Sequence, residues 1–514
     1  MSVFKAPTLT ELLEKASSEH GDKTFLKFIR DGKIEERSYD RVLSDSRAVC
    51  RRIRSVSGDK LHIALAAKTN YEYLICVTGI LTGGNTAVPF SPDISASEAV
   101  KLFTDADIDI VLYDEAFEDK LPEVKKNCGR IKHCIDLTDY SFFEETYREY
   151  SDTSEYAALS EVEIDPDDCA VIIYTSGTTG VRKGVMLSMN ALVGNIMYHD
   201  YCRIFNPEEA ALSVLPMHHI YCFSGDFIKN LKDGVQVCLN ESLKDIVKNL
   251  NLFEPETMRV VPMIARSLLQ LVKSTAVRQD HTLQQAKEKI FGKNLKWLIS
   301  GGAYLSPELT EEYDKLGIFL RQGYGMTEAG CRISVPDEQA SADSVGRVID
   351  ICRVRTQDGE IQVKTPTVML GYYKQPEETA KMFTPDGWLK TGDLGYITDD
   401  GQLFITGRVK NLIILSGGEN VSPEAIEKKF KGYPLVEEIM VYAENDRIVA
   451  EVYPDQKYAY LNGIEDIKGE IERKTDEMNS GAKPSHFISE VRLRPDPFPK
   501  THSGKIKRRK EIIK

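Results

Sequence analysis

The stretch Tyr174-Thr-Ser-Gly-Thr-Thr-Gly-Val-Arg-Lys-Gly184 concentrates glycine, serine and threonine together with two cations. The apolar run at 169–173 precedes it and is typical of a buried strand, because β-branched residues favour extended backbone. After it, Ser188 is a candidate N-cap, and Leu192 and Ile196 follow at helical spacing. The sequence therefore predicts a donor-rich loop that connects a strand to a helix.

Such a loop is suited to binding phosphate. Glycine lets the backbone approach an oxyanion, hydroxyl and amide groups donate hydrogen bonds, and Lys183 supplies positive charge. Gly184 stands where a Walker A loop has serine or threonine, so the loop belongs to another class. The alternative interpretation is a solvated turn that holds no ligand.

The loop resembles the signature loop of the adenylate-forming, or AMP-binding, superfamily. That superfamily includes acyl-CoA synthetases, the adenylation domains of peptide synthetases and firefly luciferase. A weaker match lies at 83–90, and the segment Met217-His-His-Ile-Tyr221 is most similar to bacterial fatty acyl-CoA synthetases. The clear further matches, in the family's order, are Gln322-Gly-Tyr-Gly-Met-Thr-Glu328, Lys390-Thr-Gly-Asp-Leu-Gly395, Gly407-Arg-Val-Lys-Asn411 and Pro499-Lys-Thr-His-Ser-Gly-Lys-Ile506.

The composition excludes several classes of protein. The 514-residue chain has a formal net charge of −13, which argues against broad nucleic-acid binding. No apolar run approaches the ~20 residues that span a bilayer, so we expect no transmembrane segment. The N-terminus lacks the apolar segment of a signal peptide, and the ten cysteines contain no C-x-x-C pair. We expect a cytoplasmic protein with reduced thiols.

The order of apolar runs predicts an α/β fold with two domains. Strand-like runs alternate with helical stretches in the first half, which favours α/β layers with largely parallel sheets. From about residue 345 the strands are short, and Asp400-Gly401 predicts a hairpin, so a small antiparallel β unit is expected. Residues 410–514 read as a small α+β unit. We predict a large domain at 1–409 that binds ATP and the acyl group, and a mobile C-terminal lid at 410–514; the resemblance implies the same division.

The resemblance implies a role for individual residues in binding ATP. It places the loop and Lys183 on the β- and γ-phosphates, Tyr324 on adenine, and Asp393 on the ribose hydroxyls; Arg408 is a second ribose or phosphate contact. The alternative is a plain tight turn at 323–327 and a turn aspartate at 393. The residues implied for ATP are Thr175, Ser176, Gly177, Thr178, Thr179, Gly180, Lys183, Gly301, Gly302, Ala303, Gln322, Gly323, Tyr324, Gly325, Asp393 and Arg408.

The resemblance also implies the residues of the chemical step. Thr327 contacts the α-phosphate, and Glu328 is the ligand of Mg²⁺, a hard cation that prefers carboxylate oxygens. Lys505 bridges the substrate carboxylate and the α-phosphate as a point charge. Lys410 is the hinge about which the lid rotates after adenylation, withdrawing Lys505 and opening a path for the thiol.

The acid and the acceptor are less defined. By resemblance, His219 gates the acyl pocket, and Ile220 and Ser224 line it; neither lining residue is charged. Asp226 lies beyond the second pocket position, which disfavours an amino acid substrate. We expect a medium or long aliphatic acid, with aryl acids next. Coenzyme A is the expected acceptor, although a carrier-protein phosphopantetheine uses the same thiol.

These observations predict an ATP-dependent acid–thiol ligase that forms an acyl-adenylate with release of pyrophosphate. Three alternatives stay open. The first is a stand-alone adenylation enzyme that loads an acyl, aryl or amino acid onto an acyl or peptidyl carrier protein. The second is a nucleotide-binding pseudoenzyme, which retention of the charged motif residues argues against. The third, a luciferase-like oxygenase, would share every motif.

Overall fold

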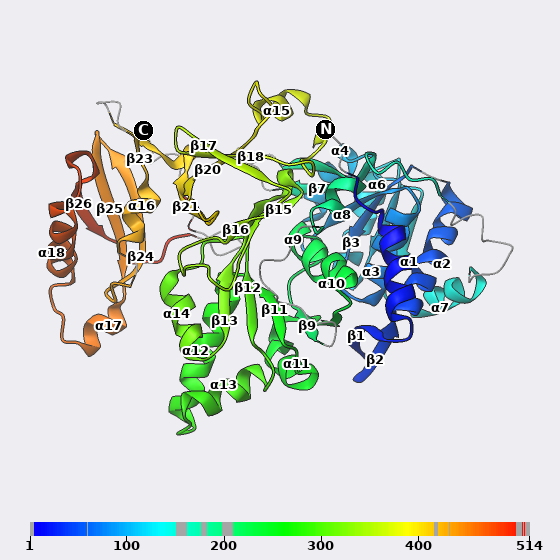
Figure 1. Cartoon of the computed structure of the whole chain (residues 1–514), viewed down its shortest axis with the longest axis horizontal. Coiled ribbons are helices and arrows are strands. Elements are labelled where there is room, and N and C mark those ends of the chain that lie inside the picture. The colour runs from blue at the N-terminus through cyan, green and yellow to red at the C-terminus, as the bar shows by residue number, and fades with distance from the viewer. Residues whose placement is uncertain are drawn as a thin grey trace.

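Two large sheets flanked by helices form the body of the chain, and a smaller unit holds its C-terminal part (Figure 1). The computed structural model describes residues 5–58, 60–150, 162–175, 182–197, 209–415, 420–430, 432–499, 506 and 508.

The first sheet is parallel except at one edge, where β2 (Lys33–Ser38) runs antiparallel to β1 (Thr24–Arg30). Its strand interiors are buried, as expected of parallel strands covered on both faces. The strands in spatial order are β13 (Phe319–Gln322), β12 (Trp297–Ser300), β11 (Thr257–Val260), β9 (Ala210–Ser213), β10 (Gln236–Leu239), β1 and β2.

The second sheet combines a parallel part with an antiparallel edge at β7, β8 and β19. The strands in spatial order are β19 (Gly371–Tyr372), β8 (Lys183–Ser188), β7 (Cys169–Thr175), β4 (Thr86–Phe90), β3 (His62–Ala66), β5 (Ile110–Tyr113) and β6 (His133–Asp136).

The connection between β7 and β8 corrects one prediction. We expected a strand, a loop and a helix, but the loop joins two antiparallel strands, with Thr175 opposite Lys183. The apolar residues after Lys183 pair with β7, and Gly184 permits the close approach, since a Cβ there would lie 2.9 Å from Ile172. The helix α8 (Met189–Gly194) begins only after β8, with Ser188 as its N-cap, as predicted.

Helices cover these sheets, and one of them is wholly internal. The helix α3 (Tyr71–Thr82) is buried along its whole length because apolar residues lie on all of its sides. The others in this part are α1 (Leu9–His20), α2 (Tyr39–Ser57), α4 (Ala96–Asp105), α5 (Glu115–Glu118), α6 (Leu121–Asn127), α7 (Tyr140–Glu149), α9 (Ile220–Cys222) with the π-helix Phe223–Ile228, α10 (Lys229–Asp233), the 3-10 turn Leu243–Asp245, α11 (Ile246–Phe253), α12 (Pro262–Arg278), α13 (Leu283–Phe291) and α14 (Pro307–Lys315).

Two small antiparallel sheets follow. They enclose their own apolar cluster, which includes Ile333, Ile361 and Leu403. Their elements are β14 (Tyr324–Met326), the 3-10 turn Thr327–Ala329, β15 (Cys331–Val335), β16 (Arg347–Val348), β17 (Arg353–Gln357), β18 (Glu360–Lys364), α15 (Pro376–Lys381), β20 (Leu389–Ile397) and β21 (Leu403–Arg408). The sheet of β17, β18, β20 and β21 is the unit predicted after residue 345, and the sheet of β14, β15 and β16 was not predicted.

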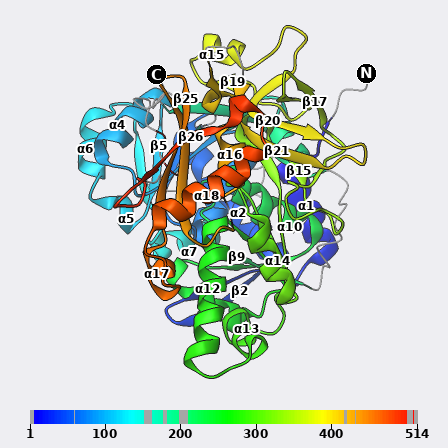
Figure 2. The same ribbon diagram turned by 90° about the vertical axis from the view of Figure 1, so that its left-hand side faces the viewer.

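The C-terminal segment packs around a separate apolar cluster, which includes Phe430, Val441 and Ile471. Figure 2 shows its helices and strands facing the viewer. Its elements are the 3-10 turn Val409–Asn411, β22 (Ile413–Ile414), β23 (Asn420–Val421), α16 (Pro423–Lys428), β24 (Val436–Glu444), β25 (Arg447–Pro454), α17 (Gln456–Leu461), α18 (Ile467–Ser480), the 3-10 turn Pro484–His486 and β26 (Ile488–Leu493).

The predicted α/β class is confirmed by these sheets, whereas the domain boundary at 409/410 stays a prediction. In the C-terminal segment, Ser422 caps α16, and β24 and β25 form an antiparallel hairpin. Across the described residues, no helix combines the length and apolar character needed to cross a membrane.

If 410–514 is a separate unit, damage to its core should stay local. Phe430 is fully buried, so Phe430→Ala should lower the free energy of unfolding of this unit by about 3–5 kcal/mol through the cavity it leaves. Hydrogen exchange should rise in β24–β26 and stay unchanged in β3 and β4. Tyr460→Ala, at a position 85% exposed, is the control. Equal acceleration in β3 and β4 would contradict the boundary.

Candidate active site

The carboxylate of Asp393 joins three of the sequence motifs. Its Oδ2 accepts a hydrogen bond of 2.7 Å from the Tyr324 hydroxyl, and its Oδ1 lies 2.8 Å from Arg408 Nε. Asp393 and Arg408 are register partners on β20 and β21, which places the two charges side by side. The Asp393 side chain is only 7% exposed. Burial, together with Asp393, raises the pKa of Tyr324 well above its ordinary value.

The turn after Tyr324 depends on glycine. A Cβ on Gly325 would lie 1.7 Å from the carbonyl oxygen of Cys331, so the backbones of β14 and β15 approach too closely for any side chain there. The chain then turns through Thr327–Ala329, and both Thr327 and Glu328 are half-buried. Gly330 and Cys331 follow with φ values of 83° and 118°.

Glu328 has one oxygen engaged by the protein. Its Oε1 accepts a hydrogen bond of 2.8 Å from the hydroxyl of the buried Tyr372. Its Oε2 has no hydrogen-bond partner among the described residues. A half-buried carboxylate with one oxygen held and the other open fits a monodentate ligand of Mg²⁺. The side chain of Glu328 therefore fits the predicted metal role, which stays a prediction.

Lys183 lies at the end of the predicted phosphate loop and close to Glu328. Its ammonium is 2.6 Å from Glu378 Oε2 on α15 and 4.8 Å from the centre of the Tyr372 ring. The hydrogen bond from Lys183, reinforced by Lys381, lowers the pKa of the Glu378 carboxyl to about 2. Tyr372 thus connects the predicted metal ligand to the predicted phosphate cation.

Residues 301–303, which are predicted to bind ATP, are hydrogen-bonded to the motif that begins at Gln322 or lie close to it. Gln322 donates from Nε2 to the carbonyl oxygen of Ala303 at 2.9 Å, and its Oε1 accepts from the backbone of Leu305 at 2.8 Å. The Gly323 amide bonds the carbonyl oxygen of Ser300. Gly301 lies against the Tyr221 ring, where a Cβ would be 2.7 Å from Cζ, and Gly302 has a φ of 74°.

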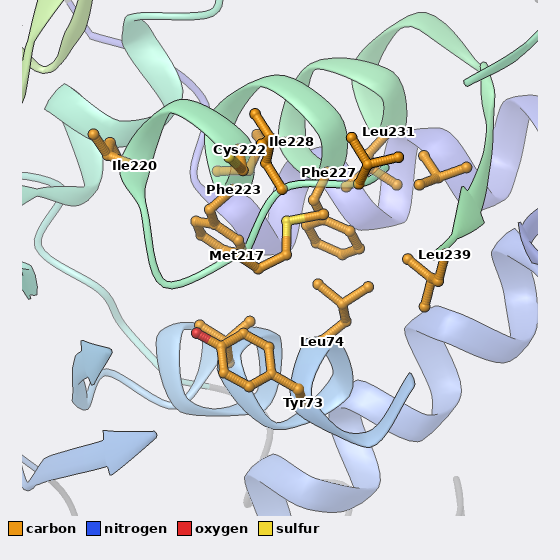
Figure 3. Packing of buried hydrophobic residues seen from close by; sticks show 14 of the residues in the cluster. Tyr73, Leu74, Met217, Ile220, Cys222, Phe223, Phe227, Ile228, Leu231 and Leu239 are labelled. Atoms are coloured by element: carbon orange, nitrogen blue, oxygen red, sulfur yellow. The ribbon is translucent and has the colours of Figure 1, made fainter. Parts of the chain in front are cut away.

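The predicted acyl-pocket residues surround the start of one helix. His219 is exposed at the N-cap of α9, whereas Ile220 and Ser224 are buried. Burial, with a contribution from His219, lowers the pKa of the adjacent His218 to about 3, so its ring is neutral near pH 7. Figure 3 shows Phe223 pointing from this helix toward α3, with Ile220 at the helix start.

Some predicted residues cannot be placed, and others were missed. Ser176, Gly177, Thr178, Thr179, Gly180 and Lys505 lie outside the described residues. Lys410 is exposed in the turn Val409–Asn411, and Asn411 donates to Glu424 on α16. The interpretation of the sequence missed Glu378, Tyr372 and Arg332; the last donates to Ser224 Oγ at 2.9 Å. A cation inside the apolar run 331–335 was the available signal for Arg332.

Comparison with known proteins decides the family. The model of the AMP-binding enzyme family matches residues 13–373, which is more than two thirds of the chain. The chain belongs to the AMP-binding enzyme family. The resemblance to the AMP-binding superfamily that the sequence motifs indicated is therefore confirmed.

Relatives and a solved structure agree with this assignment. The chain is 29% identical over 414 residues to 4-coumarate–CoA ligase 1 of Arabidopsis thaliana, covering 74% of this chain and 71% of the relative. It is 26% identical over 505 residues to a long-chain-fatty-acid–CoA ligase of Rattus norvegicus, covering 86% of this chain and 70% of the relative. An anthranilate CoA ligase in complex with anthranoyl-AMP superposes with a TM-score of 0.80 at 18% identity, covering 98% of this chain and 96% of that structure, which shows a shared fold. The predicted enzyme class, an AMP-forming ligase of the acyl-CoA synthetase type, is confirmed.

The contact between Lys183 and Glu378 predicts a measurable competition. Lys183 must leave Glu378 to contact a phosphate, so Glu378→Gln should lower the KM for ATP about 2- to 5-fold, the scale of a partly exposed ion pair. Because the pKa of Glu378 is depressed, the ion pair is complete above the ordinary carboxyl pKa and is lost only toward pH 2. The effect should therefore be constant around neutral pH.

Glu377→Gln on the same helix is the matched control, since Glu377 is exposed and its substitution also removes one negative charge. An equal change of KM in both variants would show a general charge effect and contradict the competition.

Proposed function

We propose that this protein is an ATP-dependent ligase that activates a carboxylic acid as its acyl-adenylate and transfers the acyl group to coenzyme A. ATP, Mg²⁺ and coenzyme A, the cofactors predicted from the sequence, are those of this class of enzyme. We place the reaction in the cytoplasm, where ATP and coenzyme A are both available.

One observation carries the proposal: two chains of polar contacts converge on the predicted nucleotide site. The first chain is Tyr324–Asp393–Arg408, and the second is Glu328–Tyr372–Lys183. Both begin in the short segment 324–328. In the proposal, a hydroxyl-bearing ring, a carboxylate and two cations serve one ligand, and these groups suit the parts of a nucleoside triphosphate.

The first half-reaction is a displacement at phosphorus. A carboxylate oxygen of the acid forms a bond to the α-phosphorus of ATP, the bond from that phosphorus to the bridging oxygen breaks, and pyrophosphate leaves. Both reactants are anions, so the enzyme must orient them and offset negative charge. In the proposal Lys183 and Thr327 serve the phosphates, Glu328 would hold Mg²⁺, and Lys505 offsets charge between the acid and the α-phosphate.

In the second half-reaction, the thiol of coenzyme A enters the position that Lys505 occupied during adenylation. The thiol sulfur bonds to the carbonyl carbon, AMP leaves, and the thiol proton passes to solvent. We propose that 410–514 rotates about Lys410 between the two steps. The same site must hold Lys505 during adenylation and must admit the thiol afterwards, and both cannot occupy it at once. The position of Lys410 in a short exposed turn directly after Arg408 supports this role.

The acid has an apolar body in this proposal, aliphatic first and aryl second. The relatives support either kind, because they include a 4-coumarate–CoA ligase and a long-chain-fatty-acid–CoA ligase. Asp226 is ion-paired with Arg259 at 2.8 Å, so it is already engaged and is a poor partner for the ammonium of an amino acid. This contact supports the expectation that an amino acid substrate is disfavoured.

The direct test is acid-dependent exchange of labelled pyrophosphate into ATP, followed by a thiol-acceptor assay. Exchange that requires an acid, and a thioester that forms with free coenzyme A, would support the proposal. A thioester formed only on a carrier protein would replace coenzyme A as acceptor. No exchange with any fatty or aryl acid would favour the pseudoenzyme.

Lys505 provides the sharper prediction. Lys505→Ala should reduce acid-dependent exchange about 10²- to 10³-fold, because one positioned charge is lost from the transition state. Thioester formation from supplied acyl-adenylate should be spared. Lys507→Ala removes a neighbouring charge from the same basic tail and should change neither step. An equal loss in both half-reactions would contradict the assignment of Lys505.

A further inference from the structure

The guanidinium of Arg332 on β15 is buried, and one of its nitrogens has no hydrogen-bond partner among the described residues. Arg332 is 6% exposed, and its Nη1 donates to the hydroxyl of Ser224. Its Nη2 has no hydrogen-bond partner, and none of the described residues forms an ion pair with it. A neutral serine hydroxyl is therefore the sole side-chain partner of this cation in the described part of the chain.

The nearest carboxylate is already occupied. Asp226 receives Arg259 Nη1 on Oδ1 at 2.8 Å and the Ser213 hydroxyl on Oδ2 at 3.1 Å. Both guanidiniums converge on Gly225, where a Cβ would lie 2.8 Å from Arg259 Nε and 2.8 Å from Arg332 Nη2. Two cations thus share one buried carboxylate.

This arrangement is unfavourable unless a ligand completes it. Burial raises the pKa of Asp226, against the opposing effect of Arg259, which weakens the carboxylate as a counter-charge. An unpaired buried charge costs several kcal/mol and is rarely retained without a role. Among the described residues, this cluster has one carboxylate for two guanidinium groups and no acceptor for Arg332 Nη2.

The cluster lies beside the predicted acyl pocket. Ser224 is a predicted pocket residue, and Tyr221, one turn earlier, lies against Gly301 and interacts electrostatically with Arg259 and Arg332. The opposite side of the helix is apolar, since Phe223 and Phe227 point toward Tyr73 and Leu74 (Figure 3). The helix therefore packs one face against α3 and turns its polar face toward β11 and β15.

We propose that Arg332 binds a second carboxylate at the far end of the acid, so that the preferred substrate is a dicarboxylic acid of which one carboxylate is activated. This inference rests on the proposed function and narrows its substrate class. The second carboxylate supplies the missing charge and accepts from Arg332 Nη2, a charge-assisted hydrogen bond. Arg332 is then the residue that determines specificity.

The test compares the full-length enzyme with Arg332→Met, which preserves length and apolar bulk. Straight-chain dicarboxylates from malonate to hexadecanedioate are assayed beside monocarboxylates of equal length in acid-dependent pyrophosphate exchange. The wild type should favour one dicarboxylate over its monocarboxylate in kcat/KM. Arg332→Met should lose about 10²- to 10³-fold on that dicarboxylate and gain on the monocarboxylate. Arg332→Lys should restore part of the preference.

Thermal unfolding gives a readout that does not need turnover. Without acid, Arg332→Met should unfold at the same or a higher temperature than the wild type, because an unpaired buried charge is removed. The dicarboxylates should raise the unfolding temperature of the wild type and leave the variant unchanged. Arg355→Met, which removes an arginine paired with Asp386 on the surface, is the control and should keep the wild-type preference.

The outcomes separate the two claims. No exchange with any acid, together with stabilisation of the wild type by a dicarboxylate, would contradict the proposed function and support the site. Exchange with monocarboxylates that is equal in wild type and Arg332→Met would support the function and overturn the site. A lower unfolding temperature of Arg332→Met with unchanged acid preference would show a structural arginine and also overturn it, as would a wild type that no dicarboxylate stabilises.

Discussion

The candidate site depends on the buried carboxylate of Asp393. It binds the Tyr324 hydroxyl and the Arg408 guanidinium at once, and so joins β14 to the hairpin β20–β21. A buried carboxylate of this kind needs both partners, because leaving it unpaired is costly. Next to Tyr324, Gly325 lets β14 approach β15 closely, and the chain then turns through Thr327–Ala329, where Glu328 accepts a hydrogen bond from Tyr372. Arg408 directly precedes the turn that holds Lys410.

Local features of this chain could be predicted from the sequence, whereas contacts between distant residues could not. The apolar runs predicted strands, Asp400-Gly401 predicted a hairpin, and Ser188 predicted a helix cap, because each of these features depends on neighbours in the chain. The helix after Ser188 is present as expected, but the strand β8 between the phosphate loop and this helix was missed, because Gly184 allows pairing with β7 that only the sheet reveals. Glu378 is 195 residues from Lys183, and no local pattern predicts that contact.

The two ends of the site are built on different principles. The predicted nucleotide end depends on close approaches that only glycine allows, at Gly301 and Gly325, which is why a sequence motif identifies it. The predicted acid end combines side chains from separate elements, such as Ser224 and Arg332, which are hydrogen-bonded although 108 residues separate them in the sequence. The predicted pocket positions are uncharged, yet a buried cation lies directly behind one of them. Motifs therefore identify the reaction class, whereas the choice of acid has to be inferred from contacts that only the fold reveals.

The central claim is that a carboxylate oxygen attacks the α-phosphorus of ATP at this site. The most direct measurement uses the best acid substrate with both carboxylate oxygens labelled with ¹⁸O, in the presence of ATP and coenzyme A. The account predicts that AMP acquires one labelled oxygen, because that oxygen stays on phosphorus when the thiol displaces AMP. Unlabelled AMP with label in pyrophosphate or phosphate, or formation of ADP, would contradict it.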